Sequence, residues 1–484
     1  RLKIKFQPDL RRRSMGNFQY KMIIDDIINK INNGELSSGD KLPSQREISQ
    51  YYNVNRSTVI QSLDILKSYG ILETIEKKGV YVSQYKWNAY ITSNIHWQNY
   101  IGNSMSKSNQ FYIQRINELE FNPNIIRLGT GELSPKLIPN HLFKEIISNS
   151  ISDSIQTNYE EPKGKLSLRL EVVNYMKKRG VICDVDNICI TSGAVQGLKL
   201  IADGLLVPQS KIIIETPSYI NSIRTWHNIK SKMIPLSINY IKRNINNIFK
   251  ISSNYKNSIF YCIPTLHNPT QNTYTKEEKQ KIIDQCQKNG IPIVEDSIYS
   301  DLWFDEKRPM PMKSLKNNDN VLFLGSLSKT VSPGLRIGWI VADKNVINHL
   351  SDLKMQNDYG ASSISQYIAT KWLNTYHEKH ISELKLELKK RKDIFIDALK
   401  THLSMYGSWN DPSGSFYIWF EFSISINVKK LFNESIKENI LIQPGEIYDS
   451  NYKNYIRFSY SYIDENDINR SLKKLSNIIK KIRN

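Results

Sequence analysis

Hydrophobic residues near the N-terminus recur at helical spacing. Between Phe18 and Asn33 the apolar side chains stand three or four positions apart, and Gly34 follows them. This pattern predicts an amphipathic helix that ends at the glycine. Farther along, Ser44 precedes Glu47 by three residues. That spacing is typical of a capping box and predicts a second helix from there to about residue 52.

A third helix and a hairpin complete this N-terminal block. The third helix is predicted over RSTVIQSLDILKSYG and ends at Gly70, with Val59, Leu63 and Leu66 on its inner face. The stretch ILETIEKKGVYVS predicts two strands joined by a Lys-Lys-Gly tip. Three helices followed by a β-wing indicate an α+β winged helix-turn-helix over residues 15–84.

The pattern changes twice after this block. Residues 85–122 contain aromatics, Asn and Ser with little periodicity, and we expect a linker with one short helix at most. From residue 123 to residue 484, apolar strand-like runs alternate with amphipathic helices. This alternation predicts an α/β domain with a mainly parallel sheet.

The composition limits which kinds of protein the chain can be, and it is consistent with two domains joined by a linker. The 484 residues include 66 Lys and Arg against 47 Asp and Glu, a formal net charge of +19. This balance favours a nucleic acid or an anionic cofactor as partner. No run approaches the ~18 apolar residues of a membrane helix, and four cysteines without a CxxC pair argue against a cysteine-based zinc site. We expect a cytoplasmic protein without a bound metal.

The first fourteen residues, RLKIKFQPDLRRRS, precede Met15 and are strongly basic. They lack the apolar segment of a secretory signal. We expect a cloning remnant here, with Met15 as the native start. The alternative is a basic arm that contacts phosphates.

Polar residues at the start of the third predicted helix suit contact with DNA. The first turn of a recognition helix meets base edges and phosphates in the major groove. Arginine can bind guanine there, and hydroxyls can bind phosphates or bases. The alternative is the solvated face of an interaction module. The candidate residues are Arg56, Ser57, Thr58 and Gln61 in the helix, and Lys77 and Lys78 at the wing tip.

The segment GDKLPSQREISQYYNVNRSTVIQSLDILKSYGILETIEKKGVYV resembles the winged-helix domain of GntR-type bacterial transcription regulators. The resemblance spans most of residues 18–84 and implies double-stranded operator DNA as a partner. It also implies DNA contacts from the arginine of LPSQRE, the arginine and two hydroxyls after the turn, and the wing glycine. In this chain these are Arg46, Arg56, Ser57, Thr58 and Gly79.

Polar side chains in the second domain follow apolar strands. Lys329 comes after VLFLGS, Asp296 ends IPIVED, and Asn268 follows SIFYCIPTL. In open parallel sheets the carboxyl ends of the strands face the ligand crevice. We therefore expect these three side chains to share one site.

One ligand, pyridoxal 5′-phosphate (PLP), accounts for this set. Its aldehyde requires a lysine amine, here Lys329, and its pyridine nitrogen requires a carboxylate, here Asp296. Its phosphate requires cations, hydroxyls and helix N–H groups, and its ring requires a flat partner. The remaining assignments are Asn268 and Tyr299 at the 3′-oxygen, Tyr219 at the ring, and Ser326, Ser328, Arg336, Gly193, Ala194 and Val195 at the phosphate.

The motifs TSGAVQG, ETPSY, HNPT, EDSIYSD, SLSKT…PGLRIGW and NYIRFSY resemble fold-type I aminotransferases of class I/II, over about residues 124–484. The resemblance implies Lys329 as the Schiff-base lysine and Arg457 at the substrate α-carboxylate. It further implies a homodimer in which Tyr159 reaches the phosphate in the other subunit. The linker of residues 85–122 is long enough to place a winged helix over the other subunit, so we expect that the domains are swapped. Gln271 stands where these enzymes commonly have Gly.

Together the two halves resemble the MocR subfamily of GntR regulators, over nearly all of residues 15–484. This implies a PLP-dependent transcription regulator that senses PLP or an amino compound through an aldimine at Lys329, with weak or no full transamination. Two alternatives remain open. One is an active class I/II aminotransferase with a DNA-binding appendage, and the other is a DNA-binding architectural protein whose large domain only dimerises.

Overall fold

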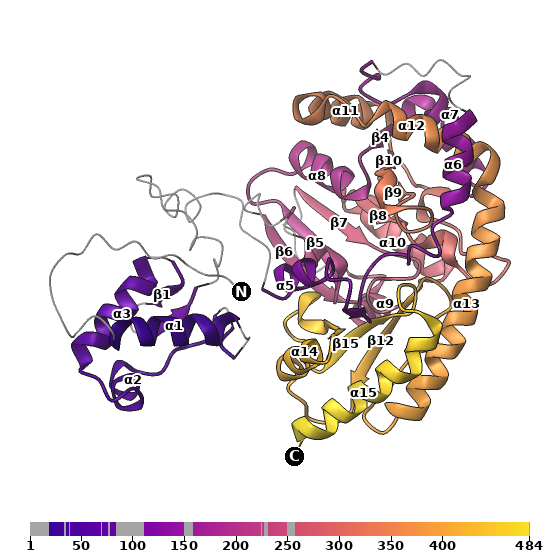
Figure 1. Ribbon diagram of the computed structural model, residues 1–484. Coiled ribbons are helices and arrows are strands. Elements are labelled where there is room, and N and C mark those ends of the chain that lie inside the picture. Colours follow the sequence, from indigo (N-terminus) through magenta and orange to yellow (C-terminus); the bar gives the residue numbers. More distant parts are fainter. Residues whose placement is uncertain are drawn as a thin grey trace. The chain divides into compact units, whose positions relative to one another are not determined.

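The computed structural model divides the chain into two compact units, Arg1–Phe111 and Tyr112–Asn484 (Figure 1). The expected cloning remnant, most of the expected linker and Lys77 lie outside the described residues. The described residues are 19–32, 35–37, 39–68, 70–75, 78–83, 111–149, 158–223, 225–226, 231–248 and 257–483.

The first unit is a winged helix-turn-helix, as predicted. Its wing strands are antiparallel, with Leu72 opposite Val82 and Ile75 opposite Gly79. Its elements are α1 (Gln19–Asn32), α2 (Gln45–Tyr51), α3 (Arg56–Ser68), β1 (Leu72–Ile75) and β2 (Gly79–Val82).

Two features predicted from sequence hold this unit together. The Ser44 hydroxyl accepts the Glu47 N–H at 3.3 Å, and the Glu47 carboxylate accepts the Ser44 N–H at 2.6 Å, which completes the capping box. The predicted inner face of α3 is buried, with Val59, Leu63 and Leu66 at most 1% exposed. These side chains form one core with α1 and the wing.

The large unit alternates helices and strands over most of its length. Its elements are α5 (Phe111–Leu119), β3 (Ile126–Arg127), α6 (Asn140–Asn149), α7 (Leu166–Lys177), β4 (Ile188–Thr191), α8 (Ala194–Leu205), β5 (Lys211–Thr216), β6 (Lys232–Ser237), α9 (Ile238–Asn244), β7 (Ser258–Cys262), α10 (Lys276–Lys288), β8 (Ile293–Asp296), β9 (Val321–Ser326), β10 (Gly338–Val341), α11 (Lys344–Asp358), α12 (Ser363–Lys371), a π-helical turn (Trp372–Tyr376), α13 (His377–His402), β11 (Gly407–Trp409), β12 (Tyr417–Phe422), α14 (Val428–Lys437), β13 (Ile440–Leu441), β14 (Gln443–Pro444), β15 (Tyr455–Ser459) and α15 (Glu465–Arg483).

A seven-stranded sheet, in the order β4-β10-β9-β8-β7-β5-β6, forms the centre of the large unit. Only β10 runs antiparallel to its neighbours, which confirms the predicted mainly parallel sheet. Alternate strand residues face opposite layers, as the two-residue period of a strand requires. Ile190 and Trp339 pack in the cluster that contains α7, whereas Cys189 and Ile340 pack in the cluster that contains α8.

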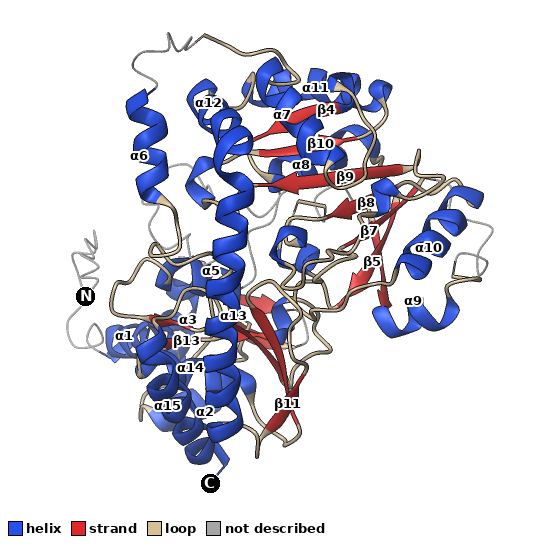
Figure 2. Cartoon of the chain, turned by 90° about the vertical axis from the view of Figure 1, so that its right-hand side faces the viewer, coloured by secondary structure: helices blue, strands red, loops and turns tan. Residues whose placement is uncertain are grey.

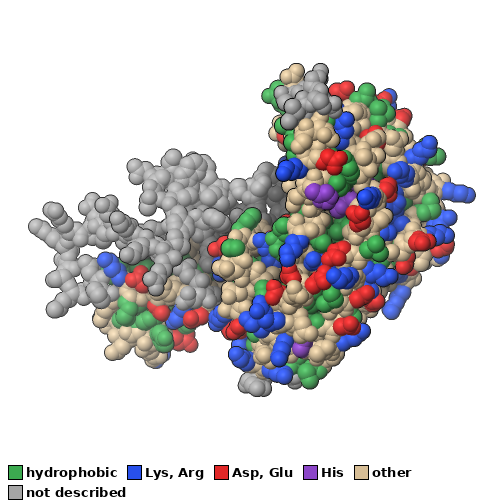
Figure 3. Space-filling model, turned by 45° about the vertical axis from the view of Figure 1, so that its right-hand side comes forward, with side chains coloured by type: hydrophobic (Ala, Val, Ile, Leu, Met, Phe, Trp, Pro, Cys, Tyr) green, Lys and Arg blue, Asp and Glu red, His purple; other side chains and the backbone are tan. Residues whose placement is uncertain are grey.

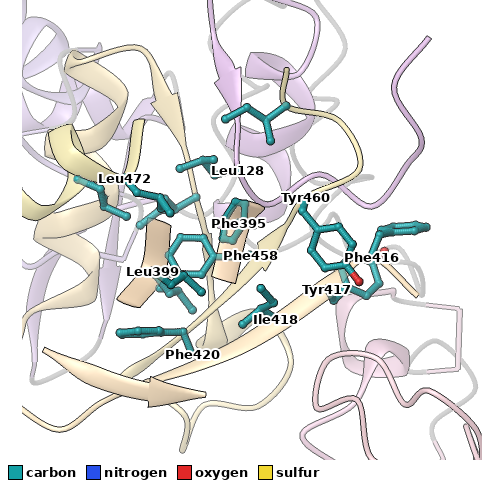
Figure 4. Close-up of a cluster of buried hydrophobic side chains, with 14 of the residues drawn as sticks. Leu128, Phe395, Leu399, Phe416, Tyr417, Ile418, Phe420, Phe458, Tyr460 and Leu472 are labelled. Carbon is teal, nitrogen blue, oxygen red and sulfur yellow. The ribbon is translucent and has the colours of Figure 1, made fainter. Parts of the chain in front are cut away.

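The C-terminal part of the large unit has its own antiparallel sheet, in the order β11-β12-β15-β14. Side chains from α13, α15 and this sheet form its core, including Phe395, Leu399, Phe458 and Leu472 (Figure 4). The long helix α13 runs from the region of α12 to α15 (Figure 2). It therefore connects the two sheets of this unit.

The short helix α5 belongs to the large unit, although it lies within the segment expected to be a linker. The Tyr112 ring meets Phe432 edge-on, with centroids 5.1 Å apart. Ile116 is buried in the C-terminal core. After α5, β3 pairs in parallel with β13, so the chain contributes to the C-terminal part before it enters the seven-stranded sheet.

Charged side chains are mixed on the surface of the large unit. Figure 3 shows Lys and Arg interspersed with Asp and Glu over the face turned to the viewer. Among the described residues, no helix combines the length and the apolar character that a membrane span requires.

We predict that Leu66→Ala weakens the winged-helix unit by about 2–5 kcal/mol, because a fully buried side chain leaves a cavity. Hydrogen exchange of peptides from residues 59–75 in the full chain measures this loss. The control, Ile60→Ala, removes an exposed side chain from the same helix and should cost about 0.5 kcal/mol or less. Equal effects of the two variants would contradict the assigned faces of α3.

Candidate functional site

The start of α3 presents most of the polar residues expected to meet DNA. Arg56, Ser57 and Gln61 are exposed and Thr58 is half-buried. The Arg56 Nε donates a long hydrogen bond to Gln45 Oε1, at 3.4 Å. This bond ties the start of α3 to the start of α2, where Arg46 is also exposed.

The wing lies beside the segment that leads into α2. Gly79 takes a φ of +120° at the wing tip, a conformation that favours glycine. A Cβ at this position would stand 3.0 Å from the Lys41 side chain. The exposed Lys78 and Lys41 thus flank one hollow of about 660 Å³, which Ser44 and Gln45 also line.

Asp296 ends β8 and is buried at the carboxyl edge of the seven-stranded sheet. Tyr261, from the neighbouring strand β7, donates to its Oδ2 at 2.7 Å. Among the described residues, its Oδ1 accepts one long bond of 3.4 Å, from the Ile298 N–H. Burial raises the pKa of Asp296 to about 6, against the lowering effects of Tyr261 and of the Lys329 charge. A cation placed at Oδ1 would therefore favour the ionised form.

Lys329 lies in the loop after β9 and points toward the backbone that follows β3. Its Nζ donates to the Gly131 carbonyl at 2.5 Å. Burial, together with the charge of Arg457, lowers the pKa of this amine to about 8, although Glu132 and Glu120 oppose the shift. Near neutral pH a usable fraction of the amine is therefore the nucleophilic, unprotonated form.

A chain of hydrogen bonds joins the remaining side chains of this edge. The Tyr299 hydroxyl lies 2.9 Å from the Tyr417 hydroxyl and accepts the Asn268 Nδ2 at 3.4 Å. The Asn268 Oδ1 in turn accepts Arg457 Nη1 at 2.8 Å. Asn268 also bonds through its carbonyl to the Tyr219 N–H, at 3.1 Å. The structure thus brings Asn268, Tyr299, Tyr219 and Arg457 together.

The predicted phosphate residues form a second group. Arg336 adopts a left-handed conformation and its Nη2 donates to the Ser192 carbonyl at 2.8 Å. Gly193 caps α8 without a side chain, so the N–H groups of Ala194 and Val195 lie at the start of that helix. Gly193 takes a φ of +84°, which favours glycine, and a Cβ there would stand 2.5 Å from Arg336 Nη2, so the arginine would have to move.

Two hydroxyls accompany this group. The Ser326 Oγ donates to Ser328 Oγ at 3.1 Å and accepts the Ser328 N–H at 3.1 Å. Ser326 ends β9 and Ser328 follows it, directly before Lys329. Both hydroxyls thus lie at the end of β9, next to Lys329 in the chain.

Tyr159 is not brought to this site within the single chain. Its side chain is 84% exposed, and its ring contacts that of Tyr359, with centroids 5.1 Å apart. Gln271, where the resemblance expects Gly, takes a φ of +63°. This left-handed backbone explains why glycine suits the position.

Several contacts at the site were not predicted. Tyr261 and Tyr417 were missed because nothing in the local sequence indicates that their hydroxyls contact Asp296 and Tyr299. Helix α13 was also missed: His380 Nε2 lies 2.8 Å from the carbonyl of Thr330, the residue after Lys329. His377 Nε2 lies 3.2 Å from Asp301, two residues after Tyr299. The first turn of α13 therefore contacts both loops that carry predicted cofactor residues.

These residues fit pyridoxal phosphate. The close approach of Arg336 to Gly193, at the start of α8, provides a cation and helix N–H groups for a phosphate. Among the described residues, the Asp296 Oδ1 makes one long hydrogen bond, so it can accept another from the pyridine nitrogen. Lys329 provides an amine with a lowered pKa. By contrast, the described residues contain no group of three His, Cys, Asp or Glu side chains suited to a metal ion.

Both units of the chain match families of known proteins. Residues 123–475 match the family "Aminotransferase class I and II", and residues 19–82 match "Bacterial regulatory proteins, gntR family". The chain is 37% identical over 466 residues to the uncharacterized HTH-type transcriptional regulator YdfD of Bacillus subtilis, covering 96% of this chain and 97% of YdfD. It is 35% identical over 446 residues to the HTH-type transcriptional regulator NorG of Staphylococcus aureus, covering 91% and 100%.

Solved structures resemble the large unit. Kynurenine aminotransferase from Pyrococcus horikoshii superposes with a TM-score of 0.71 and 27% identity, covering 76% of this chain and 94% of the enzyme. The multiple substrate aminotransferase of Thermococcus profundus gives a TM-score of 0.72 at 23% identity, covering 80% and 99%, and so shares the fold. The chain therefore belongs to the MocR subfamily of GntR-type transcription regulators, in which a winged helix is fused to a PLP-type, class I and II aminotransferase domain.

Proposed function

We propose that this regulator binds operator DNA through its winged helix and responds to PLP or to an amino compound at Lys329. One observation carries the proposal: a chain with an exposed recognition-helix start also gathers Lys329, Asp296 and Arg457 at one edge of a sheet. A DNA-binding protein that used its large domain only for dimerisation would have no need of a buried lysine, carboxyl and arginine there.

Each residue of the large unit has a distinct part in this proposal. When bound, pyridoxal phosphate supplies an aldehyde carbon that reacts with primary amines and a ring that withdraws electrons. Asp296 would hold a proton on the ring nitrogen through its Oδ1. Arg336 and the start of α8 would bind the phosphate. Lys329 would hold the cofactor in place and yield to an incoming amine.

A change at Lys329 must alter the DNA-binding state to have a regulatory effect. An effector can shift that equilibrium only by binding one state more tightly than the other. Linkage then requires operator DNA to change effector affinity by the same factor. Stoichiometric response without sustained turnover supports regulation, whereas sustained exchange with keto acids supports the aminotransferase alternative.

The first prediction concerns DNA recognition. Arg56→Ala should lose about 1–3 kcal/mol of operator affinity if Arg56 binds a base edge, because its guanidinium is exposed at the start of α3. Fluorescence anisotropy with the gene's own upstream DNA, at fixed salt, measures this loss. The control Lys21→Ala removes an exposed charge from α1. Unchanged affinity in the Arg56 variant would remove this residue from the interface.

The second prediction concerns capture of the cofactor by Lys329. The rate at which apo protein takes up PLP covalently should rise with pH up to about 8 and level off above, since the attacking amine must be unprotonated. Borohydride quenching followed by mass spectrometry measures the fixed fraction. Lys329→Ala should show no fixation at that peptide, while the control Lys316→Ala, an exposed lysine, should behave as native. A rate that keeps rising about tenfold per pH unit from pH 8 to 10 would contradict the lowered pKa, because it would mean that the amine titrates near its ordinary value.

The third prediction concerns assembly as a homodimer. Light scattering of the PLP-loaded protein should give twice the chain mass, with Tyr159 of each subunit reaching the phosphate in the other. Tyr159→Phe should weaken PLP retention about tenfold through loss of a hydrogen bond to a charged group. Mixing Tyr159→Phe and Lys329→Ala subunits should restore retention at one site per mixed dimer. Failure of this complementation would mean that Tyr159 acts within its own subunit or not at all.

A further inference from the structure

Arg457 already uses most of the hydrogens that a carboxylate would need. A guanidinium has five N–H donors. Nη1 donates to Asn268 Oδ1 at 2.8 Å. Nη2 donates to the Gly129 carbonyl at 2.7 Å and to Gln443 Oε1 at 2.8 Å. Nε is buried and has no partner among the described residues. Both hydrogens of Nη2 are therefore occupied.

The occupied nitrogen limits how a carboxylate can bind. Two parallel N–H···O bonds to a carboxylate need one edge of the planar guanidinium. One such edge pairs Nη1 with Nη2, and the other pairs Nε with Nη2. Each edge thus requires one hydrogen of Nη2. A carboxylate can bind Arg457 through two bonds only after one of the two acceptors on Nη2 has left.

Arg457 itself is fixed in position. Its side chain is 3% exposed. Its guanidinium carbon lies 3.9 Å from the centroid of the Tyr417 ring and 5.2 Å from that of Tyr448. Rotation of the arginine toward a ligand would give up these ring contacts together with its three hydrogen bonds.

Of the two acceptors, Gln443 is the one that can leave. The Gly129 carbonyl belongs to backbone held next to β13, where the Leu128 N–H donates to the Leu441 carbonyl at 2.9 Å. Gln443 contacts Arg457 through a half-buried side chain, from the position directly opposite on β14. Its side-chain torsions can carry the amide away without disturbing the strand pairing.

Arg457 Nη2, which donates to the Gln443 amide oxygen, lies near Lys329. A Cβ placed on Gly131 would lie 3.5 Å from Arg457 Nη2 and 3.9 Å from Lys329 Nζ. One small side chain would therefore span the two groups. An α-amino acid has its amine and its carboxylate on a single carbon, so a ligand of this size can address both.

We propose that Gln443 determines specificity for carboxylate-bearing ligands, because its amide oxygen holds the place on Arg457 that a ligand carboxylate must take. This rests on the proposed function, in which an amino compound binds at Lys329. Ligands with a carboxylate must displace Gln443, whereas amines without one need not. Gln443 thus weakens the advantage that Arg457 gives to amino acids over simple amines.

The test compares pairs of ligands that differ only by a carboxylate: L-alanine with ethylamine, L-leucine with 3-methylbutylamine, and L-phenylalanine with 2-phenylethylamine. The PLP-loaded protein is titrated with each, and the shift of its visible absorption band gives the affinity. Gln443→Ala should raise the ratio of amino-acid to amine affinity about tenfold, as expected when a competing bond to a charged group is removed. Gln443→Glu, which supplies its own carboxylate to Arg457, should lower the ratio at least as much.

The control Gln287→Ala removes an exposed glutamine from α10 and should leave the ratio unchanged. Far-ultraviolet circular dichroism and PLP content show whether each variant is folded and loaded. Equal changes for both members of every pair, in both Gln443 variants, would overturn the proposal.

A third measurement separates this proposal from the proposed function. Binding of 4-methylpentanoate, a carboxylate without an amine, is followed by calorimetry and does not depend on reaction at Lys329. It should bind Gln443→Ala more tightly than native protein and should not bind Gln443→Glu. If no amine shifts the absorption band but this order holds, sensing at Lys329 is wrong and the role of Gln443 stands. If this order fails, the role of Gln443 is wrong.

Discussion

The large unit must keep ionisable groups buried at one edge of its sheet, and their loss of hydration is the constraint on which the rest of the site depends. Removal from water disfavours the charged forms of Asp296 and Lys329, so the pKa of the acid rises and that of the amine falls. Arg457 cannot lose its proton in the same way. Its charge is instead stabilised by hydrogen bonds to neutral oxygens of Asn268, Gly129 and Gln443. Such an arrangement favours an anionic ligand, since a buried cation without a counter-ion is costly.

How far the sequence predicted this arrangement depended on how local each signal was. The Ser44–Glu47 capping box lies within four residues, so its pattern is visible in the sequence alone. Lys329 and Asp296 follow apolar strands, and the rule that strand ends share one edge predicts that they meet. The Tyr261–Asp296 bond was not predictable, because it depends on β7 and β8 being neighbours. The opposition of Gln443 and Arg457 likewise depends on the pairing of β14 with β15.

Short elements gave weaker signals in the sequence. The helix α5 has nine residues, too few for its periodicity to stand out in a segment rich in Asn and Ser. Its partner, Phe432, is more than three hundred positions away. Gln271 shows the same limit for backbone conformation. Nothing in its neighbours announces a left-handed residue, and only the family's usual glycine indicates it.

The contacts of α13 have a mechanical consequence. The helix has 26 residues and so measures about 39 Å. One end bears on the loop of Lys329 through His380, and the other is embedded in the core beneath the strand of Arg457. The helix α13 thus links the loop of Lys329 to the part of the core that supports Arg457. A helix of this length resists bending, so a change in its direction would occur most easily where the hydrogen bonding is irregular. The π-helical turn at Trp372–Tyr376, which directly precedes α13, is such a place, because its hydrogen bonding departs from that of the helices on either side.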